Sequence, residues 1–233
     1  MTLFLFDVDG TLVRTGGAGR AAMIEAGRRL FGVDDLFSGR DFAGAVDTGI
    51  VSHALLAAGL SPTPRRLGRF RRAYLRALRR RLPAHPGALL PGVEPLLAAL
   101  GGRGMLGLQT GNWEEGARLK LGHYGVLGPF SPGLGGFGDD GPSRDGLLAA
   151  AVPRARRRGW DGRRVVVLGD TPLDVEAARR AWARLPGRRP ELVTVALPTG
   201  VSPRAELEAV RPDLLLEDLV AGRHAIVGLA SGG

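Results

Sequence analysis

The stretch LFLFDVDGT (residues 3–11) says more about the fold than any other part of the chain. It begins as a short apolar strand and then places Asp7 and Asp9 two positions apart, so both carboxylates point the same way. Gly10 then permits a sharp turn of the backbone. Two like charges this close need a cation or a shared proton, which favours a site for a hard divalent ion such as Mg²⁺ over a surface turn that happens to contain aspartate.

Short apolar segments that run into polar, glycine-bearing turns predict parallel core strands at LFLFDV (3–8), MLGLQT (105–110) and VVVLGD (165–170). A fourth strand is expected at ELVTVAL (191–197). Helical patterns lie between these segments, at 91–102, 113–125, 144–159 and 174–185. This alternation predicts a doubly wound, Rossmann-like α/β fold with a parallel sheet, which binds ligands beyond the carboxyl ends of its strands.

The alternation is interrupted once, directly after the first strand. The segment that follows is far longer than an ordinary connection between a strand and a helix, and it contains helical patterns at 20–32, 48–59 and 65–81. Glycine and proline are frequent on both of its flanks, VRTGGAG (13–19) and PAHPGALLPG (83–92). We therefore expect an α/β core domain (1–13 and 89–233) and an inserted helical cap domain (14–88) that is hinged at these flanks.

Polar residues follow two more of the expected strands. Thr110 ends one strand, and Gly111 and Asn112 open the next helix, so a hydroxyl and backbone N–H groups meet at a helix N-terminus that suits an anion. Asp170 ends another strand, and Asp174 follows four residues later, where it could also serve as a simple helix-start carboxylate. In a parallel sheet, Asp170 should meet the aspartates of the first strand across the sheet edge.

The composition narrows the class of protein. The chain has 233 residues and no cysteine, so a disulfide framework and a thiolate site are excluded. Its net charge is +9, but the densest basic run, 65–81, has apolar residues at helical spacing, which predicts a solvated helix face and no nucleic-acid partner. No apolar run is long enough to span a membrane and no signal peptide is evident, so we expect a cytoplasmic protein. The sequence does not decide between a monomer and a dimer.

These motifs together resemble the haloacid dehalogenase superfamily over almost the whole chain. DVDGT (7–11) matches its first motif, Thr110 its second, and Gly169-Asp170 with Asp174 its fourth. Three longer phrases are similar to the branch of the phosphoglycolate phosphatases and β-phosphoglucomutases, namely GTLVRTGGAG (10–19), LLPGVEPLL (89–97) and GDTPLDVEAAR (169–179). That branch carries a helical cap at the position of the expected insertion.

The resemblance implies a role for each site residue. Asp7 would attack phosphorus and form an aspartyl-phosphate, and Asp9 would act as the general acid and base. Mg²⁺ would be held by the Asp7 carboxylate, the backbone carbonyl of Asp9, Asp170 and water, with Asp174 acting directly or through another ligand. Thr110 and its neighbouring N–H groups, those of Gly111 and Asn112, would bind the phosphoryl oxygens. The implied activity is Mg²⁺-dependent hydrolysis of a small phosphorylated metabolite.

The third motif departs from the family pattern, which places a lysine there. The corresponding stretch, GDDGPSRDG (138–146), offers Arg144, which can also bind oxyanions but is not equivalent to lysine. The alternative is Lys120, the only lysine of the chain, which lies about two helical turns beyond Thr110. Arg144 is favoured by its position and Lys120 by its chemical type; if Arg144 fills the role, replacing Lys120 should behave as a surface change.

The cap also departs from the branch, whose Gly-basic-Thr-Asp signature corresponds here to FAGAVDTG (42–49), with Ala45 at the basic position and Asp47 retained. Dehalogenation is disfavoured by Asp9, because a halide leaving group needs no proton. Phosphonate hydrolysis is disfavoured because the expected cap contains no lysine. A phosphomutase or phosphotransferase remains an alternative, as does a non-catalytic binding protein on this fold.

Overall fold

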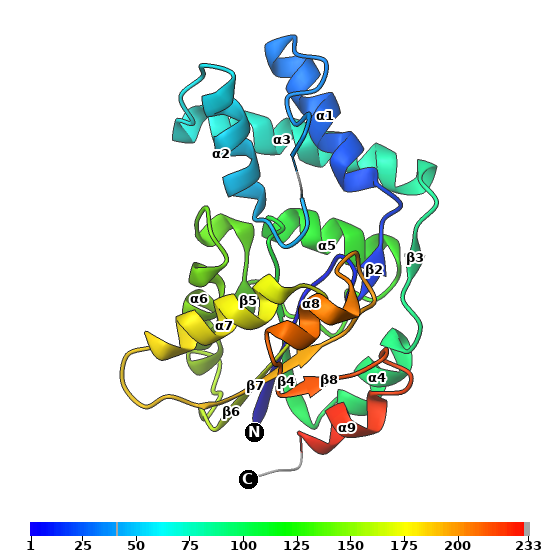
Figure 1. Cartoon of the computed structure of the whole chain (residues 1–233), viewed down its shortest axis with the longest axis vertical. Helices are drawn as coiled ribbons and strands as arrows, with labels where there is room; N and C mark the ends of the chain where they lie inside the picture. Colours follow the sequence, from blue (N-terminus) through cyan, green and yellow to red (C-terminus); the bar gives the residue numbers. More distant parts are fainter. Residues whose placement is uncertain (41, 231–233) are drawn as a thin grey trace.

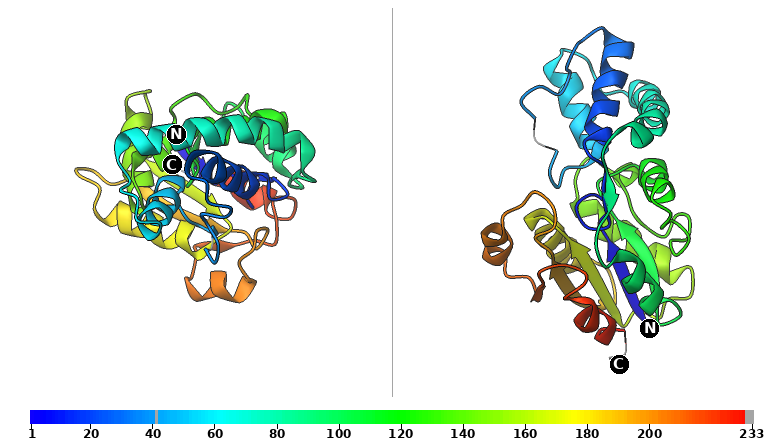
Figure 2. Two further views of the ribbon diagram at one scale, coloured as in Figure 1. Left: turned by 90° about the horizontal axis from the view of Figure 1, so that it is seen from above. Right: turned by 90° about the vertical axis from the view of Figure 1, so that its right-hand side faces the viewer.

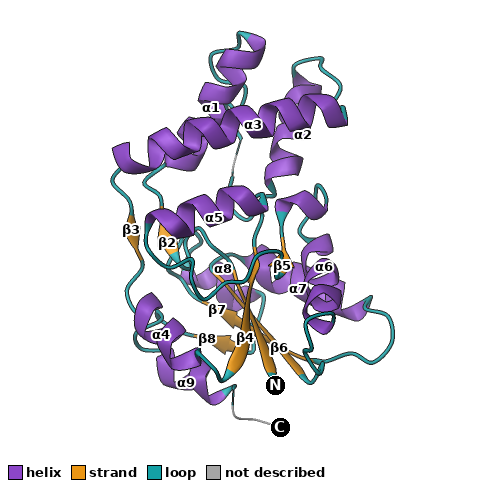
Figure 3. Ribbon diagram, turned by 180° about the vertical axis from the view of Figure 1, so that it is seen from behind, coloured by secondary structure: helices purple, strands orange, loops and turns teal. Residues whose placement is uncertain are grey.

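A computed structural model describes residues 1–40 and 42–230 of the chain. Its centre is a six-stranded sheet in the order β5-β4-β1-β6-β7-β8, and every neighbouring pair of strands is parallel (Figures 1 and 3). The strands are β1 (Thr2–Phe6), β4 (Gly104–Gln109), β5 (Gly135–Gly136), β6 (Arg164–Gly169), β7 (Glu191–Ala196) and β8 (Leu214–Leu215). Because β1 lies between β4 and β6, the chain changes direction across the sheet at β1, where a doubly wound fold leaves a crevice.

Helices cover both faces of the sheet. Side chains of a strand alternate between the two faces, and β1 is apolar on both of them. Phe4 and Phe6 of β1 pack with side chains of α4 (Val93–Leu100), α5 (Glu114–His123) and α9 (Arg223–Gly228). Leu3 and Leu5 pack on the other face with side chains of α6 (Asp145–Arg156) and α7 (Pro172–Ala183). A short helix, α8 (Arg204–Ala209), joins β7 to β8. The α/β fold predicted from the sequence is confirmed.

The edges of the sheet were not predicted. The glycine-rich stretch 131–146 contains β5 and a single 3-10 turn, η2 (Gly138–Asp140). Gly135 has a φ of 146°, and a Cβ there would lie 2.1 Å from the carbonyl oxygen of Leu108. Only glycine lets the chain approach β4 this closely, so a segment that has the composition of a loop forms a strand.

Three helices form a layer above the carboxyl edge of the sheet (Figure 2). They are α1 (Ala18–Phe31), α2 (Asp47–Ala57) and α3 (Pro64–Arg81), the last followed by a 3-10 turn, η1 (Leu82–Ala84). Together they bury an apolar cluster of their own around Phe37, Phe70 and Tyr74. The chain enters and leaves this layer through β2 (Val13–Arg14) and β3 (Ala88–Leu89), which pair with each other as antiparallel strands. We call α1–α3 the cap helices; the domain limits at 13/14 and 88/89 stay a prediction.

The basic run on α3 is a solvated helix face. Phe70, Tyr74 and Leu78 of this helix are buried, whereas Arg79 and Arg80 are ion-paired at the surface with glutamates of neighbouring helices. Such exposed pairs contribute little stability but balance the charge. Within the described part of the chain, no helix is long and apolar enough to cross a membrane. The cytoplasmic location stays a prediction.

The cap helices are tied to the core at the start of α5. The Asp47 carboxylate accepts a hydrogen bond from the Trp113 backbone N–H at 2.9 Å, and the Asp47 N–H donates to the Gly111 carbonyl at 2.8 Å. The Trp113 indole N–H donates to the Thr48 hydroxyl at 2.8 Å, and its ring lies edge-on to Tyr74, with centroids 5.5 Å apart. Trp113 itself packs in the apolar cluster of the cap.

The buried Asp47 predicts a pH-dependent stability. Burial raises its pKa to about 7, although nearby Lys120 and the hydrogen bond from Trp113 act in the opposite direction. Its contribution to the free energy of unfolding is therefore complete below its unfolded-state pKa and is lost as the pH rises to about 7. Asp47→Asn keeps an acceptor for Trp113 without the charge. We therefore expect the free energy of unfolding of the variant to rise relative to that of the wild type as the pH increases from 4 to 7.

The expected rise in the free energy of unfolding relative to wild type is on the order of a few kcal/mol, and this difference should stay constant above pH 7. Denaturant unfolding of metal-free protein at several pH values measures it. Asp34→Asn, which removes a surface carboxylate that is 95% exposed, is the matched control. A difference between Asp47→Asn and wild type that does not change between pH 4 and pH 8 would contradict the assignment.

Candidate active site

The carboxyl ends of three adjacent strands form the floor of the site. β4 and β6 flank β1 in matching parallel register, so the residues that follow these three strands meet at one edge of the sheet. Asp7, Thr110 and Asp170 lie there, and all three are buried. The sequence-based expectation that these strand ends converge is confirmed.

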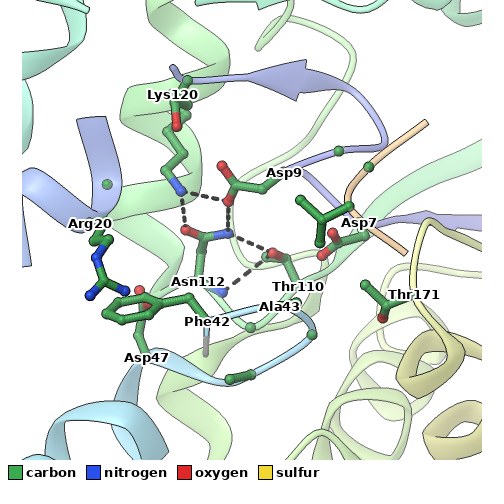
Figure 4. A pocket seen from close by; sticks show the side chains of 18 of the residues that line it. Asp7, Asp9, Arg20, Phe42, Ala43, Asp47, Thr110, Asn112, Lys120 and Thr171 are labelled. Carbon is green, nitrogen blue, oxygen red and sulfur yellow. Dashed lines mark hydrogen bonds and ion pairs between the residues drawn. The ribbon is translucent and has the colours of Figure 1, made fainter. Parts of the chain in front are cut away.

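A cavity of about 680 Å³ lies between this edge and the cap helices. It is lined by every site residue predicted from the sequence except Asp174. Its wall on the cap side includes Arg20, Phe42, Asp47 and Tyr74. None of these was predicted to line a site, although Asp47 was noted in the cap motif. Figure 4 shows the two sides facing each other.

Three carboxylates form a compact acidic cluster. One oxygen from each of Asp7, Asp170 and Asp174 lies within 4.8 Å of the others, and all three residues are buried. Burial, reinforced by the Asp174 charge, raises the pKa of Asp7 to about 7, and burial beside Asp7 raises the pKa of Asp170 well above its usual range. Buried negative charge and hard oxygen donors are what a divalent cation requires, so the cluster fits a metal ion.

Glycines make room for the Asp170 carboxylate. Gly10 has a φ of 82°, and a Cβ on it would lie 2.3 Å from Asp170 Oδ2. A Cβ on Gly200, which comes from the loop after β7, would lie 1.6 Å from the same oxygen. The Thr11 hydroxyl donates a hydrogen bond to the other oxygen, Oδ1, at 3.2 Å. The turn after β1 therefore brings Asp170 close to Asp7.

Arg144 is the cation of the acidic cluster. It precedes α6, is buried, and directs Nη2 to the carboxylates of Asp174 and Asp7, the latter at 3.3 Å. Burial alone would lower the pKa of Arg144, but the charges of these carboxylates outweigh it and raise the pKa. The Arg144 Nη1 donates to the Gly44 carbonyl of the cap at 3.1 Å. Nε of Arg144 is buried and meets no acceptor among the described residues.

Asp174 holds Arg144 from behind. Its Oδ1 accepts from the guanidinium, while its Oδ2 accepts from the backbone N–H of Thr171 at 3.0 Å and from the Thr171 hydroxyl at 2.8 Å. Both oxygens thus have protein partners, and Asp174 does not line the cavity. Its contacts are those of a residue that orients Arg144 and caps α7, so we place it behind any metal ion.

Lys120 lies in the other half of the site and is buried there. It is 4% exposed and donates to Asp9 Oδ2 at 2.5 Å and to Asn112 Oδ1 at 2.6 Å (Figure 4). The Asn112 amide in turn donates to Asp9 Oδ2 and to the Thr110 hydroxyl, each at 2.8 Å. The two candidates for the third-motif charge therefore contact different aspartates, Arg144 contacting Asp7 and Lys120 contacting Asp9.

The turn after β4 is in direct contact with the cap. A Cβ on Gly111 would lie 2.0 Å from the Ala45 carbonyl oxygen, so glycine is required for this approach. The cap motif that lacks a basic residue at Ala45 thus touches the predicted anion site through its backbone. Arg20 of α1 supplies a positive side chain nearby, with its guanidinium 4.8 Å above the Phe42 ring. Nothing in the sequence marks Arg20 among so many arginines.

Comparison with known proteins agrees with this geometry. A family model described as haloacid dehalogenase-like hydrolase matches residues 1–181. A phosphoglycolate phosphatase of Synechococcus elongatus is 33% identical over 218 residues, which cover 93% of this chain and 93% of the relative.

Two solved structures show the same fold at lower identity. A hydrolase from Pseudomonas syringae is 24% identical with a TM-score of 0.66, over 99% of this chain and 100% of that one. A structure described as a predicted phosphoglycolate phosphatase from Haemophilus somnus is 19% identical with a TM-score of 0.63, over 96% of each chain. The fold, the order of the motifs and the extent of the family match agree, and the chain belongs to the haloacid dehalogenase-like hydrolases.

Proposed function

We propose that the protein is a Mg²⁺-dependent phosphatase that hydrolyses a small phosphorylated metabolite through an aspartyl-phosphate on Asp7. The observation that carries the proposal is the division of labour between the two aspartates of the first motif. Asp7 lies in the acidic cluster beside Arg144, whereas the Asp9 carboxylate is turned toward Lys120 and Asn112. This division supports Asp7 as the nucleophile and Asp9 as the group that exchanges protons.

The reaction follows from these positions. A carboxylate oxygen of Asp7 attacks phosphorus, the bond from phosphorus to the ester oxygen breaks, and Asp9 gives its proton to the departing alkoxide. Water then attacks the aspartyl-phosphate and transfers a proton to Asp9, and the bond from phosphorus to Asp7 breaks. The products are an alcohol and inorganic phosphate, and both aspartates return to their starting states. Arg144, Thr110 and the Gly111 N–H would hold the phosphoryl oxygens, because the Asn112 N–H donates to the Thr110 hydroxyl at 3.3 Å and the Trp113 N–H donates to Asp47.

The acidic cluster supports the metal requirement. Asp7 and Asp170 would hold Mg²⁺, and Asp174 would contribute by fixing Arg144. The bound ion would neutralise charge on the phosphoryl group and on the nucleophile. Arg144 alone faces three buried carboxylates, so a second positive charge would relieve the repulsion that raises the pKa values of Asp7 and Asp170.

The cavity supports a small substrate with two anionic groups, such as phosphoglycolate. Beyond the strand edge its lining includes the arginines Arg14 and Arg20, and a cap that contacts the core at Trp113 restricts its size. The relative from Synechococcus elongatus carries the name of a phosphatase for that substrate. Release of inorganic phosphate from a panel of metabolite phosphates, with phosphoglycolate among them, tests the substrate class directly.

Replacing the nucleophile is the first test. Asp7→Asn should abolish turnover of p-nitrophenyl phosphate while the protein stays folded, because an amide does not attack phosphorus. Circular dichroism and thermal unfolding check the fold. Asp34→Asn, a change at a fully exposed aspartate of the cap segment, is the matched control and should keep wild-type activity. Hydrolysis by pure Asp7→Asn protein would rule out the proposed mechanism.

Metal removal is the second test. Exhaustive treatment with EDTA should abolish activity, and Mg²⁺ or Mn²⁺ should restore it. Ca²⁺ should inhibit, because it favours a higher coordination number than in-line attack by Asp7 allows. Asp170→Asn should raise the concentration of Mg²⁺ that gives half-maximal activity. Full activity after complete chelation would refute the metal requirement.

The third test concerns Arg144. Arg144→Met should lower kcat/KM by on the order of 10²–10³-fold, as loss of one oriented donor to a developing anion does. Arg144→Lys should recover part of the loss, since it restores the charge without the planar fork. Arg157→Met, at the exposed far end of α6, is the control for removing an arginine from this helix. Wild-type kinetics in Arg144→Met would exclude Arg144 as the third-motif cation.

A further inference from the structure

The only lysine of the chain is buried beside the proposed general acid. Lys120 is on α5, one and a half turns from the start of the helix, and its side chain reaches back toward that start. Its ammonium group has two acceptors there, Asp9 Oδ2 at 2.5 Å and Asn112 Oδ1 at 2.6 Å. A lysine that is 4% exposed is held by its charge partners, since burying an unpaired ammonium is costly.

Lys120 also determines which way the Asn112 amide faces. Because the ammonium group only donates, Asn112 must turn its oxygen to Lys120 and its NH₂ to the opposite side. That NH₂ donates to Asp9 Oδ2 and to the Thr110 hydroxyl. Both donors to Asp9, the Lys120 ammonium group and the Asn112 NH₂, therefore bind the same carboxylate oxygen, Oδ2. Among the described residues no hydrogen bond to Asp9 Oδ1 is found, so this oxygen is the one that can carry and release a proton.

The surroundings leave a defined space for the lysine. Gly19 of α1 faces it, and a Cβ there would lie 3.5 Å from the Lys120 ammonium nitrogen, so a larger side chain would enter its space. On the cap side, the positive charge of Lys120 also acts on the buried carboxylate of Asp47. Lys120 thus sits between a core carboxylate and a cap carboxylate, while Arg144 serves the acidic cluster around Asp7.

We propose that Lys120 is the positioning residue of the general acid: with Asn112 it fixes Oδ2 of Asp9 and so presents Oδ1 to the leaving oxygen of the substrate. This inference rests on the proposed function. In the first step, the bond from phosphorus to the ester oxygen breaks while the Oδ1 proton of Asp9 moves to that oxygen. In the second step, Oδ1 accepts a proton from the water that attacks the aspartyl-phosphate. Lys120 gives up no proton in either step and does not hold the phosphoryl group.

The test compares esters that differ in how much their leaving group needs a proton. Ethyl phosphate and phosphoglycolate release alkoxides that require one, whereas p-nitrophenyl phosphate releases a stable phenolate. The variants are Lys120→Met, which keeps an unbranched side chain one atom shorter and without charge, and Arg118→Met, which removes a cation from the same helix outside the cavity. Values of kcat/KM, with Mg²⁺ present, report the step in which the ester oxygen departs.

Lys120→Met should lower kcat/KM for both alkyl esters on the order of 10- to 100-fold, a part of the 10²–10⁴-fold that general acid catalysis contributes. For p-nitrophenyl phosphate the loss should be less than about threefold, since no proton is needed. A burst of p-nitrophenolate should appear in this variant, because the second step still needs Asp9 as a base. In an Asp9→Asn background, Lys120→Met should have almost no further effect on the alkyl esters. Arg118→Met should match wild type throughout.

Three results would overturn the inference. Equal losses for all three esters would mean that Lys120 supports the fold or the phosphoryl group. A loss confined to phosphoglycolate would mean that it binds the carboxylate of that substrate. Wild-type rates in Lys120→Met would mean that it has no part in the reaction. If the wild-type protein hydrolysed none of the esters, the proposed function itself would fail, and this inference with it.

Discussion

The site depends on one electrostatic constraint, the gathering of buried carboxylates at the edge of a parallel sheet. Asp7, Asp170 and Asp174 lie within 4.8 Å of one another where water is largely excluded. Their mutual repulsion and desolvation favour protonation, which would remove the nucleophile. The buried guanidinium of Arg144 lies among these carboxylates and offsets part of their repulsion. Their oxygen atoms are also suitable ligands for a divalent ion, which would offset more of it.

Much of the fold could be predicted because its long elements have strong patterns. The four main core strands are short apolar runs, and the cap helices show apolar residues at helical spacing, so each lies within a few residues of its expected position. The two-residue strands β2, β3, β5 and β8 are too short to have a pattern. These strands form because the tertiary fold brings their backbone within hydrogen-bonding distance of a neighbouring strand. At Gly135, the absence of a side chain lets the chain approach β4.

The candidate site was predictable to the same extent and for a similar reason. Strand order places Asp7, Thr110 and Asp170 together, because parallel strands end at one edge. The contact between Lys120 and Asp9 was not predictable, since it depends on the angle at which α5 leaves the turn after β4. Arg20 was missed because its place in the cavity depends on how the cap packs on the core, and its residue type is common in this chain.

The antiparallel pairing of β2 with β3 has a consequence for how this architecture can diversify. It brings Val13 and Leu89 into register, so the two ends of the cap segment leave the core side by side. Pairing of β2 with β3 closes the loop that contains the cap helices. Because the entropic cost of closure grows only slowly with loop length, the length of the cap segment has little effect on the stability of the sheet. Evolution can thus exchange or reshape the helices above the ribbon, and with them the choice of substrate, while the strand ends that carry the chemistry stay unchanged.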